Sequence, residues 1–254
     1  RDSTRTFCSN CFRPRSKNHQ WQPTPRAGAS VNTSVARLHE IAGPTGRLEA
    51  HILEPEPVLG GEFCSPRSAV VLAHPHPLHG GTMHSKIVYQ TAKALSRIGC
   101  VTLRFNFRGV GTSEGTFDEG RGEQEDFRAA LNVMGDRYPG IELWAAGYSF
   151  GAFIALSIGV ADPRVTTLIG IAPPLMDKYD LSPVTQSRKP KFLIHGEADE
   201  LIPLKEIRRF YGSLEEPKEL VVVDAADHLF DGHVSEVGDA VEDLLGDFIL
   251  NTDQ

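Results

Sequence analysis

A serine flanked by two glycines has the surroundings that most clearly indicate chemistry in this sequence. Gly147-Tyr148-Ser149-Phe150-Gly151 has the pattern G-x-S-x-G and joins an apolar segment predicted to be a strand, 141–146, to one predicted to be a helix, 150–160. A serine at such a sharp strand-to-helix turn has an exposed hydroxyl, and the helix N-terminus presents N–H groups to developing negative charge. The pattern therefore predicts that Ser149 is a nucleophile. The alternative is a glycine-rich turn with an unreactive serine.

A nucleophilic serine needs a base and an acid that orients this base. Asp199 lies in the segment HGEADELIP after one predicted strand, and His228 lies in DAADHLF after the last one. The order Ser149, Asp199, His228 is the order expected for a nucleophile, acid and base at the edge of an α/β sheet. Glu197 remains open as an alternative acid, and His233 as an alternative base.

A group of histidines and a pair of cysteines raise the question of a metal. The histidines lie in a loop rich in proline and glycine: His74, His76, His79 and His84. Because no carboxylate lies among them, we expect them to shape this loop and a pocket rim, with a zinc site as the alternative. Cys8 and Cys11 form a lone C-x-x-C without a second ligand pair nearby, so no metal or other cofactor is expected.

Strands and helices are predicted to alternate along most of the chain. Short apolar runs indicate strands, and apolar residues spaced three or four apart indicate helices. The predicted strands are 48–53, 69–73, 101–105, 141–146, 165–171, 192–195 and 219–223, and the predicted helices are 86–98, 123–137, 150–160, 204–214 and 237–249. This alternation predicts an α/β fold with a mainly parallel central sheet that helices cover on both faces. Sites in such sheets lie beyond the carboxyl ends of the strands, where Ser149, Asp199 and His228 are found.

Two further segments make the sequence resemble a known family. HPHPLHGGTMH at 74–84 and LRFNFRGVGTSEG at 103–115 each follow or end a predicted strand. Together with G-x-S-x-G and the late histidine, they make residues 45–250 similar to the α/β-hydrolases. Within that superfamily the chain resembles small, lidless hydrolases related to the dienelactone hydrolase-like esterases. Ser149 replaces the cysteine nucleophile of true dienelactone hydrolases, which favours ester or thioester substrates.

The resemblance implies a role for each candidate residue. Ser149 would attack an acyl carbonyl, His228 would accept the proton and return it to the leaving group, and Asp199 would orient His228. Arg104 and Arg108 are expected to pair with acids beneath the site, with recognition of a substrate carboxylate as the alternative.

The resemblance also implies an oxyanion hole formed by two backbone N–H groups. One would belong to Phe150 and the other to the loop that contains the histidines. Proline has no N–H, so His76 is the expected second donor, with Leu78 as the alternative. We expect Leu78, His79 and Tyr148 to line the substrate pocket.

The connection between the two strands in which a lid would be inserted is too short for a large lid. Only residues 172–190 separate two consecutive strands, enough for a short helix but not for a cap of several helices. The expected function is that of a serine esterase without a cofactor, which cleaves small or short-chain acyl esters through an acyl-enzyme intermediate. The alternatives are an acyl thioesterase and a catalytically silent hydrolase fold that serves as a binding module.

Charge divides the chain into two parts. Residues 1–37 carry seven basic residues and one acid, whereas 38–254 carry 19 basic and 32 acidic residues, a net charge of −13. We expect residues 1–37 to be a disordered tail, with an organelle-targeting segment as the alternative, and 38–254 to be a cytoplasmic catalytic domain. The acidic domain is not expected to bind nucleic acid or a membrane. The uncharged stretch 143–161 contains glycines, and we interpret it as a strand and a helix.

Overall fold

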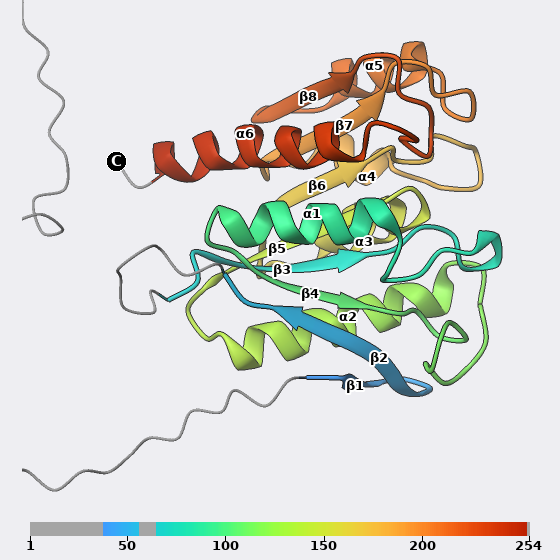
Figure 1. Cartoon of the computed structure of the whole chain (residues 1–254), viewed down its shortest axis with the longest axis vertical. Coiled ribbons are helices and arrows are strands. Elements are labelled where there is room, and N and C mark those ends of the chain that lie inside the picture. The colour runs from blue at the N-terminus through green and yellow to red at the C-terminus, as the bar shows by residue number, and fades with distance from the viewer. Residues whose placement is uncertain (1–37, 56–64, 253–254) are drawn as a thin grey trace, which may run out of the picture. The chain divides into compact units, whose positions relative to one another are not determined.

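A central sheet organises the part of the chain that the structure, a computed structural model, describes: residues 38–55 and 65–252. The eight strands of this part follow the order β1-β2-β4-β3-β5-β6-β7-β8 (Figure 1). β2 pairs antiparallel with β1 and β4, and all other neighbours are parallel. The strands are β1 (Glu40–Gly43), β2 (Gly46–Leu53), β3 (Ser68–Ala73), β4 (Val101–Phe105), β5 (Glu142–Tyr148), β6 (Val165–Ile171), β7 (Lys191–Gly196) and β8 (Lys218–Val223).

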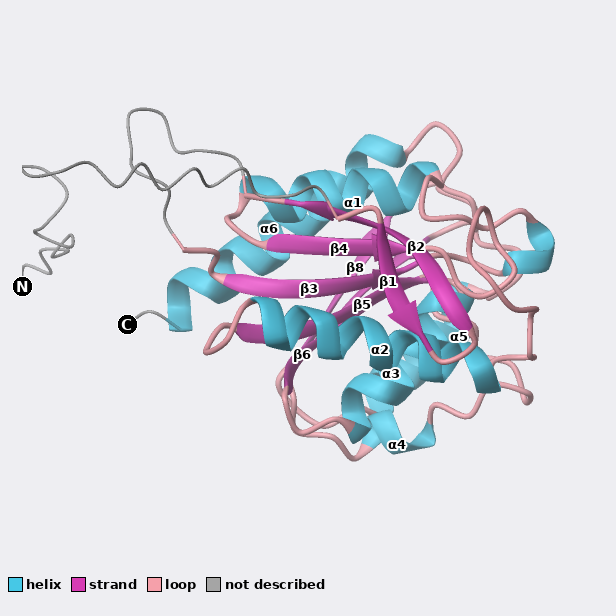
Figure 2. Cartoon of the chain, turned by 90° about the horizontal axis from the view of Figure 1, so that it is seen from below, coloured by secondary structure: helices cyan, strands magenta, loops and turns pink. Residues whose placement is uncertain are grey.

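Helices cover both faces of the sheet (Figure 2). The helices are α1 (Lys86–Arg97), α2 (Arg121–Arg137), α3 (Phe150–Ala161), α4 (Ser182–Thr185), α5 (Leu204–Ser213) and α6 (Val234–Thr252), with a short 3₁₀ helix, η1 (Pro77–His79). α1 and α6 pack side by side on one face, and α2 and α3 pack on the other. Val70 and Leu72 of β3 belong to the hydrophobic core beneath α1 and α6, whereas Val71 and Ala73 belong to the core beneath α2 and α3. This burial on both faces explains why β3 is apolar throughout.

The predicted fold class is confirmed, and every predicted strand and helix is present. Strands 101–105 and 165–171 have the predicted bounds, and the other elements differ by one to three residues. α2 begins two residues before the prediction because Glu123 accepts the N–H of Gly120 at 2.7 Å and so caps the helix. β1, α4 and η1 were not predicted, since each is too short to show a periodicity.

The connection from β6 to β7 contains only the four-residue helix α4, so no large lid is present there, as predicted. The uncharged stretch 143–161 is divided between β5 and α3. None of the helices in the described ranges is both long and apolar enough to span a membrane. The expectations for residues 1–37, including Cys8 and Cys11, lie outside the described residues.

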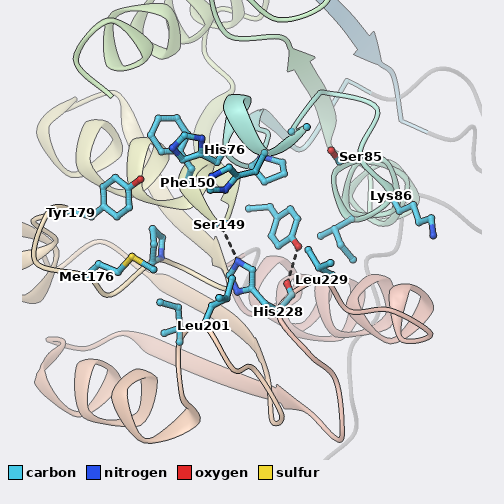
Figure 3. Close-up of a pocket in the computed structure, with 18 of the residues that line it drawn as sticks. His76, Ser85, Lys86, Ser149, Phe150, Met176, Tyr179, Leu201, His228 and Leu229 are labelled. Carbon is cyan, nitrogen blue, oxygen red and sulfur yellow. Dashed lines mark hydrogen bonds between the residues drawn. The ribbon is translucent and has the colours of Figure 1, made fainter. Parts of the chain in front are cut away.

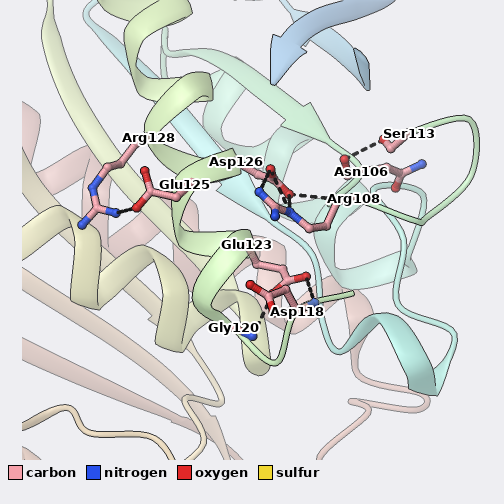
Figure 4. A network of polar contacts seen from close by, with 9 residues as sticks. All are labelled: Asn106, Arg108, Ser113, Asp118, Gly120, Glu123, Glu125, Asp126 and Arg128. Atoms are coloured by element: carbon pink, nitrogen blue, oxygen red, sulfur yellow. Dashed lines mark hydrogen bonds and ion pairs between the residues drawn. The ribbon is translucent and has the colours of Figure 1, made fainter. Parts of the chain in front are cut away.

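Arg104 near the end of β4 and Arg108 just after this strand have different partners. Arg108 forms a buried ion pair with Asp126 of α2, in which Nη2 lies 2.7 Å from Oδ1 and Nε 3.0 Å from Oδ2 (Figure 4). The prediction that Arg108 pairs with an acid is therefore confirmed. For Arg104 it is wrong: Nη1 donates to the carbonyl oxygen of Met83 at 2.9 Å, and no acid of the described segments pairs with it.

The buried ion pair provides a test of what holds α2 to β4. Asp126→Asn leaves the buried Arg108 cation without its counter-charge, so we expect the free energy of unfolding to fall by about 3 kcal/mol. Glu125→Gln is the matched control, because its neighbouring carboxylate pairs with Arg128 on the exposed side of the same helix. There we expect a change below about 0.5 kcal/mol. Urea unfolding measures both, and equal losses in the two variants would contradict this account.

Candidate active site

The turn between β5 and α3 holds Ser149 in a rare backbone conformation. Its φ is 52° and its ψ is −120°, which strains a residue with a side chain. Both flanking glycines are sterically required. A Cβ at Gly147 would clash with the carbonyl oxygen of Gly151, and one at Gly151 would clash with the carbonyl oxygens of Ala73 and His74. The turn therefore presents the serine hydroxyl at the carboxyl edge of the sheet, as the G-x-S-x-G pattern predicts.

The structure brings the three predicted chemical side chains into one hydrogen-bonded chain. Ser149 Oγ lies 2.9 Å from His228 Nε2 (Figure 3). On the other side of the ring, His228 Nδ1 lies 2.7 Å from Asp199 Oδ2. Asp199 follows β7 and His228 follows β8, so neighbouring parallel strands deliver them to the same edge. Because Nδ1 faces a carboxylate, it carries the proton, and Nε2 is left to accept the serine proton.

Asp199 is held as a carboxylate. Its Oδ1 accepts the N–H groups of Leu201 at 2.9 Å and Ile202 at 2.8 Å. Burial opposes the negative charge, but the hydrogen bonds from His228 and Ile202 outweigh this effect, and the pKa of Asp199 lies below its ordinary value. The carboxylate is therefore ionised at neutral pH, and its second oxygen is free to face His228.

The alternative acid and base lie elsewhere. Glu197 Oε2 accepts the N–H of Ala225 at 3.1 Å and does not contact His228. His233 lies just before α6, where its Nδ1 is 3.4 Å from Glu236. The geometry thus joins Ser149 to His228 and Asp199 rather than to these residues.

Two side chains, one next to His228 and one next to Asp199, were not recognised as supporting residues from the sequence. Tyr148 donates its hydroxyl to the carbonyl oxygen of His228 at 2.8 Å, and burial raises its pKa, so it remains protonated. His195, at the end of β7, is fully buried. Its Nε2 donates to the carbonyl oxygen of Ile202 at 2.8 Å and lies 3.6 Å from Asp199 Oδ2. One indication of this role was present in the sequence, because His195 ends a predicted strand and lies four residues before Asp199.

The loop after β3 presents a free N–H close to the serine turn. The N–H groups of His76 and Phe150 make no hydrogen bond within the described part of the chain, whereas the N–H of Leu78 donates to Nδ1 of His76 at 3.2 Å. The His76 ring packs 4.5 Å from the His79 ring and 5.0 Å from the Phe150 ring, measured between centroids. Of the two predicted second donors, only His76 therefore has an unused N–H.

The other two histidines of the loop, His74 and His84, lie in different surroundings. Phe107 donates its N–H to His74 Nε2 at 3.1 Å. The other ring nitrogen, Nδ1, therefore carries the proton and donates it to the carbonyl oxygen of Pro75 at 2.6 Å. Burial lowers the pKa of His74 to about 4, which keeps this ring neutral. His84 is exposed. Within the described ranges, no group of three or more histidine, cysteine and acidic side chains is placed to hold a metal ion.

A cavity of about 510 Å³ opens over Ser149 (Figure 3). The predicted pocket residues Tyr148 and His79 line it, whereas Leu78 does not and is 69% exposed. Its walls are mainly apolar and come from the β3 loop, the start of α1, the β6–β7 connection and the turns after β7 and β8; they include His76, Ile87, Phe150, Met176, Tyr179, Leu201 and Leu229. A volume of this size accommodates a small organic ligand.

Comparison with known proteins agrees with this geometry. Residues 65–189 match the family model described as serine aminopeptidase, S33. An uncharacterized protein of Rickettsia prowazekii is 33% identical over 212 residues, which cover 80% of this chain and 86% of that protein. An α/β serine hydrolase homologue from Coxiella burnetii is 37% identical with a TM-score of 0.74, covering 81% of this chain and 95% of the other.

A solved structure also matches the absence of a lid. The α/β serine hydrolase without a lid from Xanthomonas campestris is 34% identical with a TM-score of 0.73, covering 82% of this chain and 92% of that one. The protein therefore belongs to the lidless serine hydrolases of the α/β-hydrolase superfamily.

Proposed function

We propose that the protein is a carboxylic ester hydrolase that cleaves small or short-chain acyl esters through an acyl-enzyme intermediate. The observation that carries this proposal is the 2.9 Å contact between Ser149 Oγ and a His228 ring whose other nitrogen faces the Asp199 carboxylate. That arrangement lets the imidazole take a proton from the serine while the carboxylate stabilises the charge that results.

The reaction proceeds in two halves. Ser149 Oγ forms a bond to the acyl carbon as His228 Nε2 takes its proton, and the carbonyl oxygen becomes an oxyanion. Collapse of this intermediate breaks the ester C–O bond, and His228 gives its proton to the departing alcohol. Water then attacks the acyl carbon of the acyl-serine while His228 Nε2 takes one of its protons. As the bond from this carbon to Ser149 Oγ breaks, His228 returns the proton to Oγ, and the acid leaves.

The oxyanion would be bound by the unused N–H groups of Phe150 and His76. Phe150 is the first residue of α3, so its N–H has no acceptor in the preceding turn of the helix. Each such donor contributes about 3–4 kcal/mol to the stabilisation of the transition state. Pro75 and Pro77 beside His76 have no N–H to offer.

Labelling with a fluorophosphonate tests the reactive serine. We expect the wild type to be labelled and Ser149→Ala to be unlabelled, because the probe reacts only with an activated serine. His228→Ala and Asp199→Asn are expected to lower ester turnover by about 10³- to 10⁴-fold or more.

His233→Ala and Glu197→Gln are the matched controls, and both are expected to keep wild-type turnover. Labelling that persists in Ser149→Ala would exclude this serine. A folded wild type that is not labelled would favour the catalytically silent alternative.

The His76 N–H is testable because its backbone φ of −55° suits proline. His76→Pro removes the N–H, whereas His76→Ala removes the same ring but keeps the N–H. We expect kcat of His76→Pro to lie about 10²- to 10³-fold below that of His76→Ala, since one oxyanion donor is lost. Steady-state kinetics on one short ester measure the difference, and equal kcat values would assign the second donor to another residue.

The open, lidless cavity predicts the size of the substrate. With only α4 in the β6–β7 connection and a cavity of about 510 Å³, we expect short-chain esters to be turned over faster than long-chain triglycerides. Rates on esters of increasing chain length check this, and faster hydrolysis of emulsified long-chain triglyceride would contradict it.

The thioesterase alternative needs a separate test, since the same three residues can serve both reactions. Rates on an ester and a thioester with the same acyl group, measured in parallel, distinguish the two activities.

A further inference from the structure

Arg104 is a buried arginine without an acidic partner. It lies on β4, and the whole residue is only 4% exposed. One nitrogen, Nη1, donates to the carbonyl oxygen of Met83 at 2.9 Å, and the guanidinium lies 5.2 Å from the centroid of the Tyr89 ring. Nε is buried without a hydrogen-bond partner, and Nη2 has no partner either among the described residues. Buried charges are normally paired, so this arrangement leaves the charge without a counter-ion and the buried Nε without an acceptor, while Nη2 has no acceptor among the described residues.

Arg108, four residues later, shows what those two donors usually do. Its Nε and Nη2 form one planar fork, and both bind the carboxylate of Asp126, at 3.0 Å and 2.7 Å. Nε and Nη2 are also the pair that stays free on Arg104. The same fork geometry recognises carboxylates and phosphates by two parallel hydrogen bonds. An oxyanion placed against Arg104 as Asp126 is placed against Arg108 would satisfy both donors.

Space for such a group lies next to Arg104. A cavity of about 410 Å³ is lined by Arg104, by residues of α1 and by the end of β2, and it shares no lining residue with the cavity over Ser149. Lys93 and Tyr89 of α1 line it, and Lys93 Nζ lies 5.9 Å from the centroid of the same Tyr89 ring. Glu54 also lines it, but one of its carboxylate oxygens accepts the hydroxyl of Tyr138 at 2.8 Å.

We propose that this cavity is a second binding site, which takes the carboxylate or phosphate group of a small molecule on the free fork of Arg104, with Lys93 at its rim. The charges favour an anion, because among the described residues two cations, Arg104 and Lys93, line the cavity against the one carboxylate of Glu54. The hydrogen bond from Nη1 to Met83 holds the guanidinium in place. The half-exposed Tyr89 ring lies close to both cations and forms part of the lining that the rest of such a molecule would contact.

The proposal is tested by titrating the protein with inorganic phosphate, and separately with succinate, at an ionic strength held constant with chloride. Calorimetry and the rise in Tm give the affinity, and a ligand that binds the folded state raises Tm by mass action. We expect saturable binding with a Kd in the millimolar range or below. A stronger response to phosphate or to succinate shows which oxyanion the site prefers.

Three variants locate the binding. Arg104→Lys keeps the charge but has no fork, so we expect the Kd to rise at least about ten-fold. Lys93→Gln is expected to raise the Kd about three-fold, through the loss of one partly exposed charge. Lys86→Gln is the matched control, because Lys86 lies on the same helix but lines the cavity over Ser149; its Kd should equal that of the wild type.

Two results would overturn the proposal. One is a folded wild type that binds neither anion up to about 50 mM, where a millimolar site would be nearly saturated. The other is binding that Lys93→Gln and Lys86→Gln leave equally unchanged, which would place the anion elsewhere. The comparison of these two lysines, neither of which is buried, decides the question even where Arg104→Lys fails to fold. The test needs no catalytic activity, so it stands or falls independently of the proposed esterase.

Discussion

The positive φ of Ser149 is the constraint on which the rest of the site depends. A residue in this conformation costs about 1–3 kcal/mol, and the surrounding backbone holds it there. Its N–H donates to the carbonyl oxygen of Ile171 at the end of β6, at 2.8 Å, and its carbonyl oxygen accepts the N–H of Ala152 in α3, also at 2.8 Å. One strand and one helix thus fix the two peptide groups of the serine. The backbone at the serine is consequently fixed without a substrate, which the proposed role of Ser149 as a nucleophile requires.

The partners of the serine are positioned by backbone contacts between neighbouring turns. The turn that carries Asp199 and the turn that carries His228 are joined by the N–H of Ala198, which donates to the carbonyl oxygen of Ala226 at 2.9 Å. A Cβ at Gly196 would clash with Ala226, so glycine allows this close approach. The separation of the carboxylate and the imidazole is therefore set by the parallel pairing of β7 and β8 and by the packing of their turns, rather than by the two side chains alone.

The sequence predicted what local patterns encode and missed what only the packing decides. The apolar runs and the glycine-rich turn were enough to predict the sheet, both layers of helices and the order of Ser149, Asp199 and His228. The choice between His228 and His233 depends on which turn reaches the serine, and five residues of separation carry no information on that. Arg104 and Arg108 have the same side chain in the same segment, yet only Arg108 faces an acid, because Asp126 approaches from a helix that packs on one face of the sheet.

The segment 103–115, which contributes strongly to the family resemblance, holds the site together without lining the cavity over Ser149. Asn106 accepts the N–H of Met83 through Oδ1 at 2.7 Å, while Arg104 binds the carbonyl oxygen of the same residue. Phe107 donates its N–H to His74, which anchors the beginning of the loop that carries His76. Both ends of this loop are therefore attached to the end of β4. A fold without a lid has no mobile cap to complete its site, so the position of the His76 N–H rests on this fixed attachment to the strand next to β3.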